Sequence, residues 1–544
     1  MSDISRRSFG RAASTAALLA ATGQVGSSQV AKARTYDVRD YGAKGDGATL
    51  DTAAVQAAID ACATDKGRTV LAPAGDFVIG TVQLKSNVTL HLSPSGRLLG
   101  SGNPADYSAG KGVPPGNGNI VMVYAANAEN VAIEGRGTID GHGDKFYTGK
   151  GDNTGPGGNA AAGYRERPHL AIFYRCTRLM LRDVFLTRSA YHCVRVLNCR
   201  FVQIDGVRIH NRVNLNNDGF HLNSNEHVSI SNCDVACQDD ACALFGSNRF
   251  VTITNCTFST RWSIFRFGGG TAEDITVSNC VIYETYGCPI KIRVSAGSRL
   301  ENISFSNLIM DKVTGPISVG LDSNYRRPAA ETNPRPKGII RNLTFSNIRA
   351  TVVAQGGQFA DMPFKNNFRP GETRTCIVLN GVGDEYLEGI TLSDVHVRFE
   401  GGGTAEEAAR RDVPKMAGEY FELGTLPAYG LYARNARALT LRNVRFEVDS
   451  PDLRPAVVFD HVVDASVAGL AAQGNPRGEA LLRFTNTRDT LLTGTRVLTP
   501  CAVFLRVEGA ESAGIVVDGG DLSKAEAPLS FGGGAGKEAV RVRG

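Results

Sequence analysis

A short segment recurs through the middle of the chain and constrains its fold more than any other feature. VSISNC, VTITNC and ITVSNC place an asparagine at positions 232, 255 and 279, each followed by a cysteine. Each segment alternates apolar or β-branched residues with polar ones and then turns, which predicts short strands. Asn or Asp occupies the same point in six further segments: Asp183, Asp205, Asn307, Asn347, Asp394 and Asn443.

A repeat of about 20 to 50 residues is typical of solenoids and propellers. Short strands without helical periodicity favour a parallel β-helix over helical arrays, and propeller repeats are usually nearer about 40 to 45 residues. In a β-helix, residues one period apart lie above one another. We therefore expect the asparagines to form a ladder at a turn and the cysteines to form a column in the core.

The repeats predict one continuous domain over residues 35–544. Residues 52–62, TAAVQAAIDAC, place Val55, Ala58, Ile59 and Cys62 on one helical face, which predicts a short capping helix over the first coil. Residues 401–420 form a charged insertion, and the glycine-rich residues 532–536 predict a loose tail.

The first 33 residues are typical of an export signal. SRRSF at residues 5–9 precedes an apolar, alanine-rich run, and AKA at residues 31–33 supplies the small residues that a signal peptidase reads. This pattern looks like a twin-arginine signal peptide. We expect a periplasmic or secreted mature protein without a membrane span, because no other apolar run reaches about 18 to 20 residues.

Charge and cysteine content narrow the possible partners. The formal net charge is +5, and residues 1–33 contribute +3 of it through Arg6, Arg7, Arg11 and Lys32 against Asp3. The remaining charge of about +2 is too small to indicate nucleic-acid binding.

Twelve cysteines in an exported chain would suggest disulfides, but twin-arginine substrates usually cross the membrane already folded. We therefore expect most of these cysteines to be reduced and buried.

Three aspartates fall at matching points of successive coils. Asp239 and Asp240, in ACQDDACA, are adjacent, and Asp218, in NLNNDGFHL, precedes them by one period. Stacking would bring all three carboxylates into one patch. Crowded carboxylates raise the pKa of at least one member, which creates a general acid beside ionised bases.

Cations follow the aspartates at a distance of one to three coils. Lys291 and Arg293, in PIKIRVSAG, share a strand face, and Arg261 and Arg266 lie on the coil before them. Such a group can bind a uronate carboxylate or neutralise the aspartates.

These motifs resemble those of glycoside hydrolase family 28, the polygalacturonases and rhamnogalacturonases. NND at residues 216–218, QDD at 238–240 and KIR at 291–293 are similar to that family's Asn-Thr-Asp, Asp-Asp and Arg-Ile-Lys motifs. YDVRDYGAKGDG near the N-terminus and RPHLAIF at residues 167–173 also look like the family. The resemblance implies an all-β, right-handed parallel β-helix and an inverting hydrolase.

The same resemblance implies residue roles. Asp239 would protonate the glycosidic oxygen, while Asp218 and Asp240 would hold and deprotonate the attacking water. Lys291 and Arg293 would contact the sugar or its carboxylate on the leaving-group side. We expect a monomeric enzyme that acts on an acidic, pectin-like polysaccharide or oligosaccharide, a galacturonan or a rhamnogalacturonan. It should require no cofactor or metal.

The chain differs from the family at two points. RWSIFRFG at residues 261–268 stands where the family has Gly-His-Gly, and the basic motif is reversed. The missing histidine favours a rhamnogalacturonan-type substrate over plain polygalacturonate. Further side chains expected to contact substrate are Asn216, His192, His221, Trp262, Arg266 and Tyr325.

Two other classes fit the same fold. A calcium-dependent lyase or C5-epimerase would use the aspartates as calcium ligands and Lys291 or Arg293 as base. A non-catalytic carbohydrate-binding β-helix would use neither set for chemistry.

Overall fold

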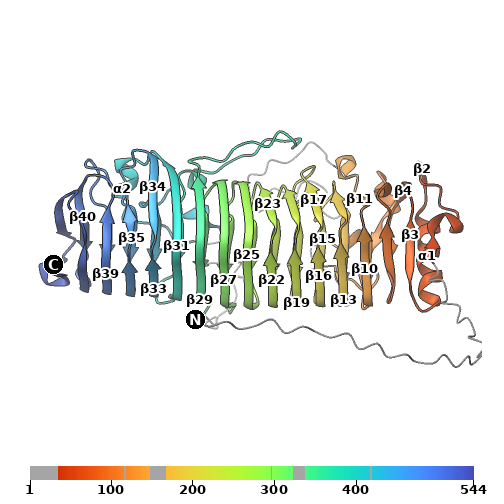
Figure 1. The fold of residues 1–544 in the computed structure, drawn as a ribbon, viewed down its shortest axis with the longest axis horizontal. Coiled ribbons are helices and arrows are strands. Elements are labelled where there is room, and N and C mark those ends of the chain that lie inside the picture. The colour runs from red at the N-terminus through yellow and green to blue at the C-terminus, as the bar shows by residue number, and fades with distance from the viewer. Residues whose placement is uncertain are drawn as a thin grey trace, which may run out of the picture. The chain divides into compact units, whose positions relative to one another are not determined.

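The computed structural model of the chain describes residues 35–115, 118–146, 167–295, 297–322, 337–416 and 419–543. Residues 35–544 form one compact unit in which strands stack in three rows (Figure 1). Each turn of the chain, called a coil below, pairs in parallel with the next coil. The first and second rows belong to a 27-stranded sheet, and the third row is a 16-stranded sheet. The predicted parallel β-helix is confirmed, and the propeller alternative is wrong.

The strands of the first row follow one another at coil spacing. They are β1 (Thr35–Asp37), β3 (Thr69–Ala72), β6 (Thr89–Leu92), β10 (Glu129–Gly135), β13 (Thr177–Arg182), β16 (Arg200–Asp205), β19 (Glu226–Ser231), β22 (Arg249–Thr254), β33 (Ala436–Arg442), β36 (Val463–Ala468), β41 (Ala513–Asp521) and β43 (Val540–Arg543). Six longer strands continue from the first row into the second: β41 and also β25 (Thr271–Thr285), β27 (Arg299–Val313), β29 (Ile339–Val352), β31 (Leu387–Gly401) and β39 (Arg488–Val497).

The other two rows complete each coil. The second row contains β2 (Asp46–Leu50), β4 (Gly75–Ile79), β7 (Gly96–Gly100), β11 (Thr138–Asp140), β14 (Phe185–Thr187), β17 (Arg208–Asn211), β20 (Asp234–Cys237), β23 (Thr257–Thr260), β34 (Arg445–Ser450) and β37 (Ala471–Ala472). The third row contains β5 (Val82–Gln83), β9 (Ile120–Ala126), β12 (His169–Tyr174), β15 (Val194–Leu197), β18 (Phe220–Asn223), β21 (Cys242–Phe245), β24 (Phe265–Gly268), β26 (Ile290–Val294), β28 (Ile317–Leu321), β30 (Ile377–Asn380), β32 (Leu431–Arg434), β35 (Val457–Asp460), β38 (Leu482–Thr485), β40 (Cys501–Glu508) and β42 (Ala525–Gly532), with β8 (Ser108–Ala109) antiparallel to β9.

Helices are few and short. The described ones are α1 (Thr52–Thr64), α2 (Ala405–Ala409) and the 3-10 turns η1 (Val38–Tyr41), η2 (Pro104–Asp106), η3 (Gly143–Phe146), η4 (Pro370–Glu372), η5 (Tyr420–Leu423) and η6 (Lys537–Ala539). Helix α1 packs against β1, β3 and β5, and the predicted residues Val55, Ala58, Ile59 and Cys62 are its buried ones. It therefore covers the open end of the core, as predicted.

Register between coils keeps like residues in line. In the first row Leu179 lies opposite Val202, Val202 opposite Val228, and Val228 opposite Val251, and all four are at most 2% exposed. Parallel pairing at constant register therefore builds a continuous apolar column inside the coils.

The predicted asparagine ladder is present at the turn between the first two rows. Asn307 Nδ2 donates to Asn279 Oδ1 at 3.0 Å, and Asn347 Nδ2 donates to Asn307 Oδ1 at 2.8 Å. Their φ angles of 49–56° lie in the left-handed region, which Asn tolerates better than most residues. The side-chain amides thus satisfy one another along the stack while the backbone turns.

One member of the predicted ladder is misplaced. Arg182 lies opposite Asp205, so Asp183 aligns with Gly206 and not with Asp205. Gly206, at φ 65°, occupies the left-handed position in that coil. Asp205 instead accepts hydrogen bonds from Ser231 Oγ and Asn232 Nδ2 of the next coil, both at 2.7 Å.

The cysteine prediction is confirmed. All twelve cysteines are free and buried, and Cys233, Cys256 and Cys280 form the expected column beneath the asparagines at 1–2% exposure. They act as small apolar residues of the core.

The predicted loose tail is wrong. After β42 the chain makes the turn η6 and adds β43, which pairs with β41 through Ile515 opposite Val540 and Val517 opposite Val542. Residues 532–536 thus belong to the turn that links β42 to β43, and each of these strands pairs with a strand of the preceding coil. Gly533 and Gly534 take positive φ angles in this turn, which glycine adopts without steric cost.

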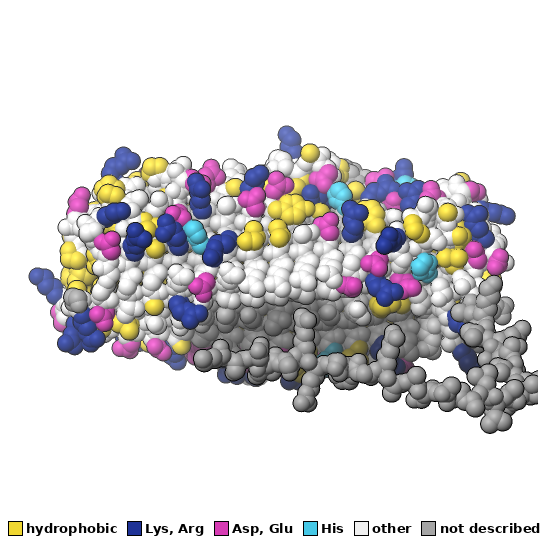
Figure 2. Space-filling view, in the orientation of Figure 1, with side chains coloured by type: hydrophobic (Ala, Val, Ile, Leu, Met, Phe, Trp, Pro, Cys, Tyr) yellow, Lys and Arg dark blue, Asp and Glu magenta, His cyan; other side chains and the backbone are white. Residues whose placement is uncertain are grey.

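The surface is mixed in charge. On the face drawn in Figure 2, Lys and Arg side chains are interspersed with Asp and Glu side chains. Among the described residues, no helix has the length and apolar character needed to cross a membrane.

Candidate active site

The three aspartates lie in turns that lead from the second row into the third. Asp218 precedes β18, and Asp239 and Asp240 lie between β20 and β21. Gly219 N donates to Asp240 O at 3.0 Å and Asp239 N donates to Asn217 O at 3.1 Å. Backbone pairing thus holds the two turns against each other, as the sequence spacing predicts.

Asp239 is partly buried, and its carboxylate accepts two hydrogen bonds. Asp240 N donates to Asp239 Oδ1 at 2.9 Å, and Asn216 Nδ2 donates to Asp239 Oδ2 at 3.3 Å. Burial, together with the neighbouring carboxylates of Asp218 and Asp240, raises the pKa of Asp239 well above its usual range, although Lys291 acts in the opposite direction. Such a carboxyl retains its proton at a pH where an ordinary aspartate is ionised.

Asp218 is buried and lies next to two histidines. His221 Nδ1 is 2.8 Å from Asp218 Oδ2, and His192 Nε2 is 3.8 Å from the same oxygen. Burial, followed by the charge of Asp240, raises the pKa of Asp218. Burial also lowers the pKa of His221 to about 3 and that of His192 well below its usual value. Both rings are therefore neutral near pH 7, and when Asp218 is ionised it accepts a hydrogen bond from His221 Nδ1–H.

The same group has the composition of a metal site. His192, Asp218 and His221 each offer one ligand atom, all within 4.8 Å of one another. The two imidazoles stack at 4.7 Å between ring centroids, and the positive charge of Arg195 acts on both of them. A nearby guanidinium disfavours a bound cation, so the arrangement suits a neutral histidine pair better than a metal ion.

A buried polar frame supports the aspartates from behind. Asn217 Oδ1 accepts from Val213 N and Asn214 N at 3.0 and 2.7 Å, and its Nδ2 donates to two backbone carbonyls at 2.9 Å. Arg167 Nη1 donates to Leu215 O at 2.7 Å, and its Nη2 reaches Asn216 Oδ1 at 3.2 Å. These roles were not predicted, because nothing in the spacing of Asn217 or Arg167 shows where their side chains point.

Gly219 is required by close approach. A Cβ atom at this position would lie 2.4 Å from Ala241 O and 2.8 Å from a methyl carbon of Val235. The glycine after Asp218 therefore allows the two aspartate turns to pack directly on each other.

The predicted cations share one side of the third row. Arg266 lies opposite Lys291, and Gly268 lies opposite Arg293. All three cations contact one carboxylate, that of Glu419: Arg266 Nη2 is 2.8 Å, Lys291 Nζ 3.3 Å and Arg293 Nη1 3.4 Å from its oxygens. Although burial alone would raise the pKa of Glu419, the charges of Arg266, Lys291 and Arg293 lower it to about 2. The carboxylate is therefore ionised throughout the range in which the protein would act.

Trp262 joins the coils to the chain segment that carries Glu419. Its ring centroid is 5.0 Å from Lys291 Nζ, 4.7 Å from the guanidinium of Arg261 and 6.4 Å from the ring of Phe421. Arg261 is fully buried and forms an ion pair of 3.0 Å with Glu372, so it has a structural role behind the tryptophan.

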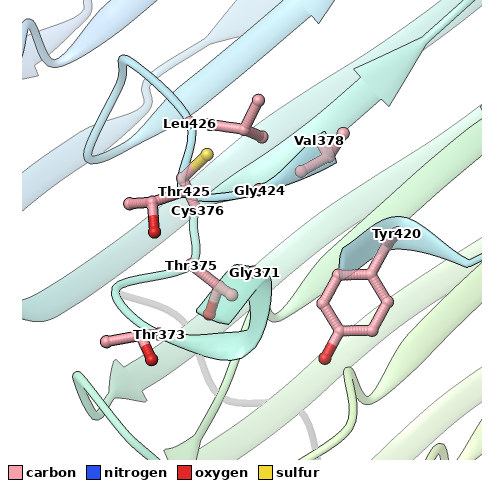
Figure 3. A pocket seen from close by; sticks show the side chains of 9 residues that line it. All are labelled: Gly371, Thr373, Thr375, Cys376, Val378, Tyr420, Gly424, Thr425 and Leu426. Atoms are coloured by element: carbon pink, nitrogen blue, oxygen red, sulfur yellow. The ribbon is translucent and has the colours of Figure 1, made fainter. Parts of the chain in front are cut away.

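A small recess lies beside this contact and is shown in Figure 3. Its wall includes Gly371, Thr373 and Thr375 from one side and Tyr420, Gly424 and Thr425 from the other. None of the three aspartates lines it. The recess marks the junction between η4 and η5 and is separate from the carboxylates.

The structure thus places most of the predicted residues together. Asp218, Asp239, Asp240, Asn216, His192 and His221 form one group, and Trp262, Arg266, Lys291 and Arg293 form the adjoining one. Tyr325 lies outside the described residues. Glu419 was missed: residues 401–420 were recognised as charged, but the sequence did not distinguish this glutamate from the others in the segment.

The fold and the carboxylate group together define a β-helical glycosidase. Residues 62–369, more than half of the chain, match Glycosyl hydrolases family 28, and the chain belongs to that family. The prediction of a glycosidase is confirmed over the lyase, epimerase and non-catalytic alternatives.

Polygalacturonases are among the known proteins of similar sequence and fold. An exopolygalacturonase of Oenothera organensis is 24% identical over 378 residues, which are 66% of this chain and 93% of that protein. The structure of a family 28 exopolygalacturonase of Yersinia enterocolitica is similar at a TM-score of 0.60 and 20% identity, over 80% of this chain and 79% of that one. An exopolygalacturonase structure from Thermotoga maritima gives a TM-score of 0.56 at 19% identity, over 76% and 92%.

The raised pKa of Asp239 has a consequence for stability. Because its pKa is higher in the folded chain than in the unfolded one, the folded state is progressively destabilised as the pH rises above the unfolded value of about 4. Asn cannot ionise, so Asp239→Asn should raise the midpoint of thermal unfolding at about pH 7 and raise it less at about pH 4. Asp234→Asn, an exposed neighbour on β20, should show no such gain. A lower midpoint for Asp239→Asn at both pH values would contradict this prediction.

Proposed function

We propose that the chain is an inverting glycoside hydrolase that cleaves a pectin-type polysaccharide or oligosaccharide. The observation that carries the proposal is the meeting of three aspartates from two coils, of which Asp218 and Asp239 have raised pKa values. The names of its relatives support a galacturonate-containing substrate.

The roles proposed for the aspartates are those that the family resemblance implies. Asp239 retains a proton and gives it to the glycosidic oxygen as the bond to the anomeric carbon breaks. Asp218 and Asp240 hold a water molecule, whose oxygen bonds to the anomeric carbon and whose proton passes to a carboxylate. Inversion requires the acid and the base to lie roughly 6.5 to 9.5 Å apart with water between them. Turns on adjacent coils are about 4.8 Å apart, and side chains that splay apart from them can reach that separation.

The remaining predicted residues surround this reaction. Asn216 and His221 orient Asp239 and Asp218 through their hydrogen bonds, and His192 stacks on His221. Arg266, Lys291, Arg293 and Trp262 form the side of the site on which the leaving sugar would lie. For Tyr325 we retain only the proposal of a substrate contact.

Hydrolysis fits these contacts better than elimination. A lyase or epimerase would need Lys291 or Arg293 free to remove a proton from the sugar. Both side chains are already held by Glu419, at 3.3 and 3.4 Å. The aspartates carry the acid and base functions instead.

The main test is a substitution at the proposed general acid. Asp239→Asn should lower kcat on galacturonan or rhamnogalacturonan by about 10²- to 10⁴-fold, since general acid catalysis is worth about that much. The assay counts new reducing ends and records ultraviolet absorbance of unsaturated sugars. We expect reducing ends without that absorbance, and Asp234→Asn should retain activity. Unsaturated products, or full activity of Asp239→Asn, would refute the mechanism.

The hydrogen bond from His221 should set the acidic limit of activity. A donor to the ionised form of Asp218 is worth about 1 kcal/mol, so its loss should move the acidic limb of the kcat profile upward by roughly 0.5 to 1 pH unit. His221→Phe tests this, and His221→Asn, whose amide can donate, should restore the limb. The control is His227→Phe, at an exposed ring on β19. An unmoved limb in His221→Phe would show that His221 does not act on the base.

Export is also part of the proposed function. The twin-arginine pattern of residues 1–33 supports a periplasmic or secreted location for the enzyme, and polymeric substrates are found outside the cytoplasm. We also propose that the enzyme acts as a monomer. N-terminal sequencing of the protein recovered outside the cytoplasm should find a start shortly after the AKA site at residues 31–33. An intact N-terminus would contradict cleavage there.

A further inference from the structure

The cation group of the third row is almost entirely buried. Arg266 is 5% and Lys291 4% exposed, and Arg293 is only partly exposed. Buried cations require a compensating anion, since removing an unpaired charge from water is strongly unfavourable. In a site that binds acidic polysaccharides, the obvious anion is the carboxylate of a uronate.

Glu419 already supplies that anion. Arg266 binds it through two nitrogens, Nη2 to Oε1 at 2.8 Å and Nη1 to Oε2 at 3.2 Å. Lys291 Nζ lies 3.3 Å from Oε2 and Arg293 Nη1 3.4 Å from Oε1. Both carboxylate oxygens are thus engaged, in the forked geometry that an arginine uses to bind any carboxylate.

Packing on either side holds Glu419 in place. Tyr420, the residue after Glu419, begins η5, and η5 contacts η4. Phe421 lies 6.4 Å from the ring of Trp262, and the guanidinium of Arg369 stacks 4.2 Å above Phe421. The glutamate is therefore fixed by aromatic contacts to the coils as well as by its ion pairs.

Other carboxylates take up the remaining positive charge. Arg266 interacts electrostatically with Asp240 as well as with Glu419, and Arg293 Nε is 3.9 Å from the buried Asp322 Oδ2. A further carboxylate brought in by substrate would meet cations that are already neutralised. It would also be repelled by Glu419 at short range.

We propose that Glu419 occupies the position of a substrate carboxylate, so that the leaving-group side of the site accepts a neutral sugar joined to a uronic acid. This inference rests on the proposed hydrolysis and specifies its substrate as an alternating acidic and neutral polysaccharide. The fixed carboxylate accepts hydrogen bonds from sugar hydroxyls, which a neutral residue offers without charge repulsion. Glu419 lies beyond residues 62–369, the part of the chain that matches the family.

A binding experiment tests this apart from catalysis. In the Asp239→Asn background, full-length protein is titrated with trigalacturonate and with an oligosaccharide of alternating galacturonate and rhamnose. Glu419→Gln should tighten the Kd for trigalacturonate at least tenfold and change that for the alternating probe less than threefold. The matched control, Glu406→Gln, removes the same charge from an exposed glutamate of the same inserted segment and should change neither Kd.

Kinetics separate the two proposals. With Asp239 intact, the chain should hydrolyse the alternating probe faster than trigalacturonate, and Glu419→Gln should narrow that preference at least tenfold. If neither probe is hydrolysed, the proposed function fails and the binding titration still decides the role of Glu419.

Unchanged or weaker trigalacturonate binding by Glu419→Gln overturns the inference. Faster hydrolysis of trigalacturonate than of the alternating probe by the protein with Glu419 intact also overturns it. Thermal unfolding checks that each variant is folded, and Glu419→Ala provides a second way to remove the carboxylate. Either folded variant is sufficient for the comparison.

Discussion

Parallel pairing at constant register is the constraint on which every other feature of this molecule depends. Each coil repeats the backbone path of the one before, so a side chain has a chemically related neighbour directly above and below it. A favourable contact, once made, is then available again in the next coil. An unfavourable contact is repeated in the same way, and only a change of residue type removes it.

The turns of the β-helix show both results of stacking. At the turn between the first two rows, neutral amides such as Asn279 and Asn307 donate and accept along the stack, which satisfies polar groups at little cost. At the turn into the third row, Asp218 meets Asp239 and Asp240, and burial together with the crowded carboxylates raises the pKa values of Asp218 and Asp239. The second arrangement lowers the stability of the folded state but places groups that can transfer protons side by side. Hydrogen bonds from the surrounding histidines and backbone amides limit that loss of stability.

Much of the fold and of the site could be predicted from the sequence, because stacking brings residues that are one period apart in the sequence next to each other. The period located the asparagine ladder, the cysteine column and the aspartate group, and helical periodicity located the four buried residues of α1. The misplacement of Asp205 arose from a one-residue offset that only the pairing of Arg182 with Asp205 reveals. The role of Glu419 could not be predicted for a different reason. Its partners are 126 to 153 residues away in the sequence, and its position depends on how an inserted segment folds back over the coils. No period relates such a segment to the residues that it contacts.

The separation between Glu419 and its partners also bears on how the molecule is assembled. The coils that carry Arg266, Lys291 and Arg293 leave the ribosome well before residue 419, so three clustered cations exist in the growing chain without their shared counter-ion. Until the later segment arrives, these cations lack the carboxylate that pairs with all three of them. The ion-pair group on this side of the catalytic centre can therefore be completed only after residue 419 has been synthesised.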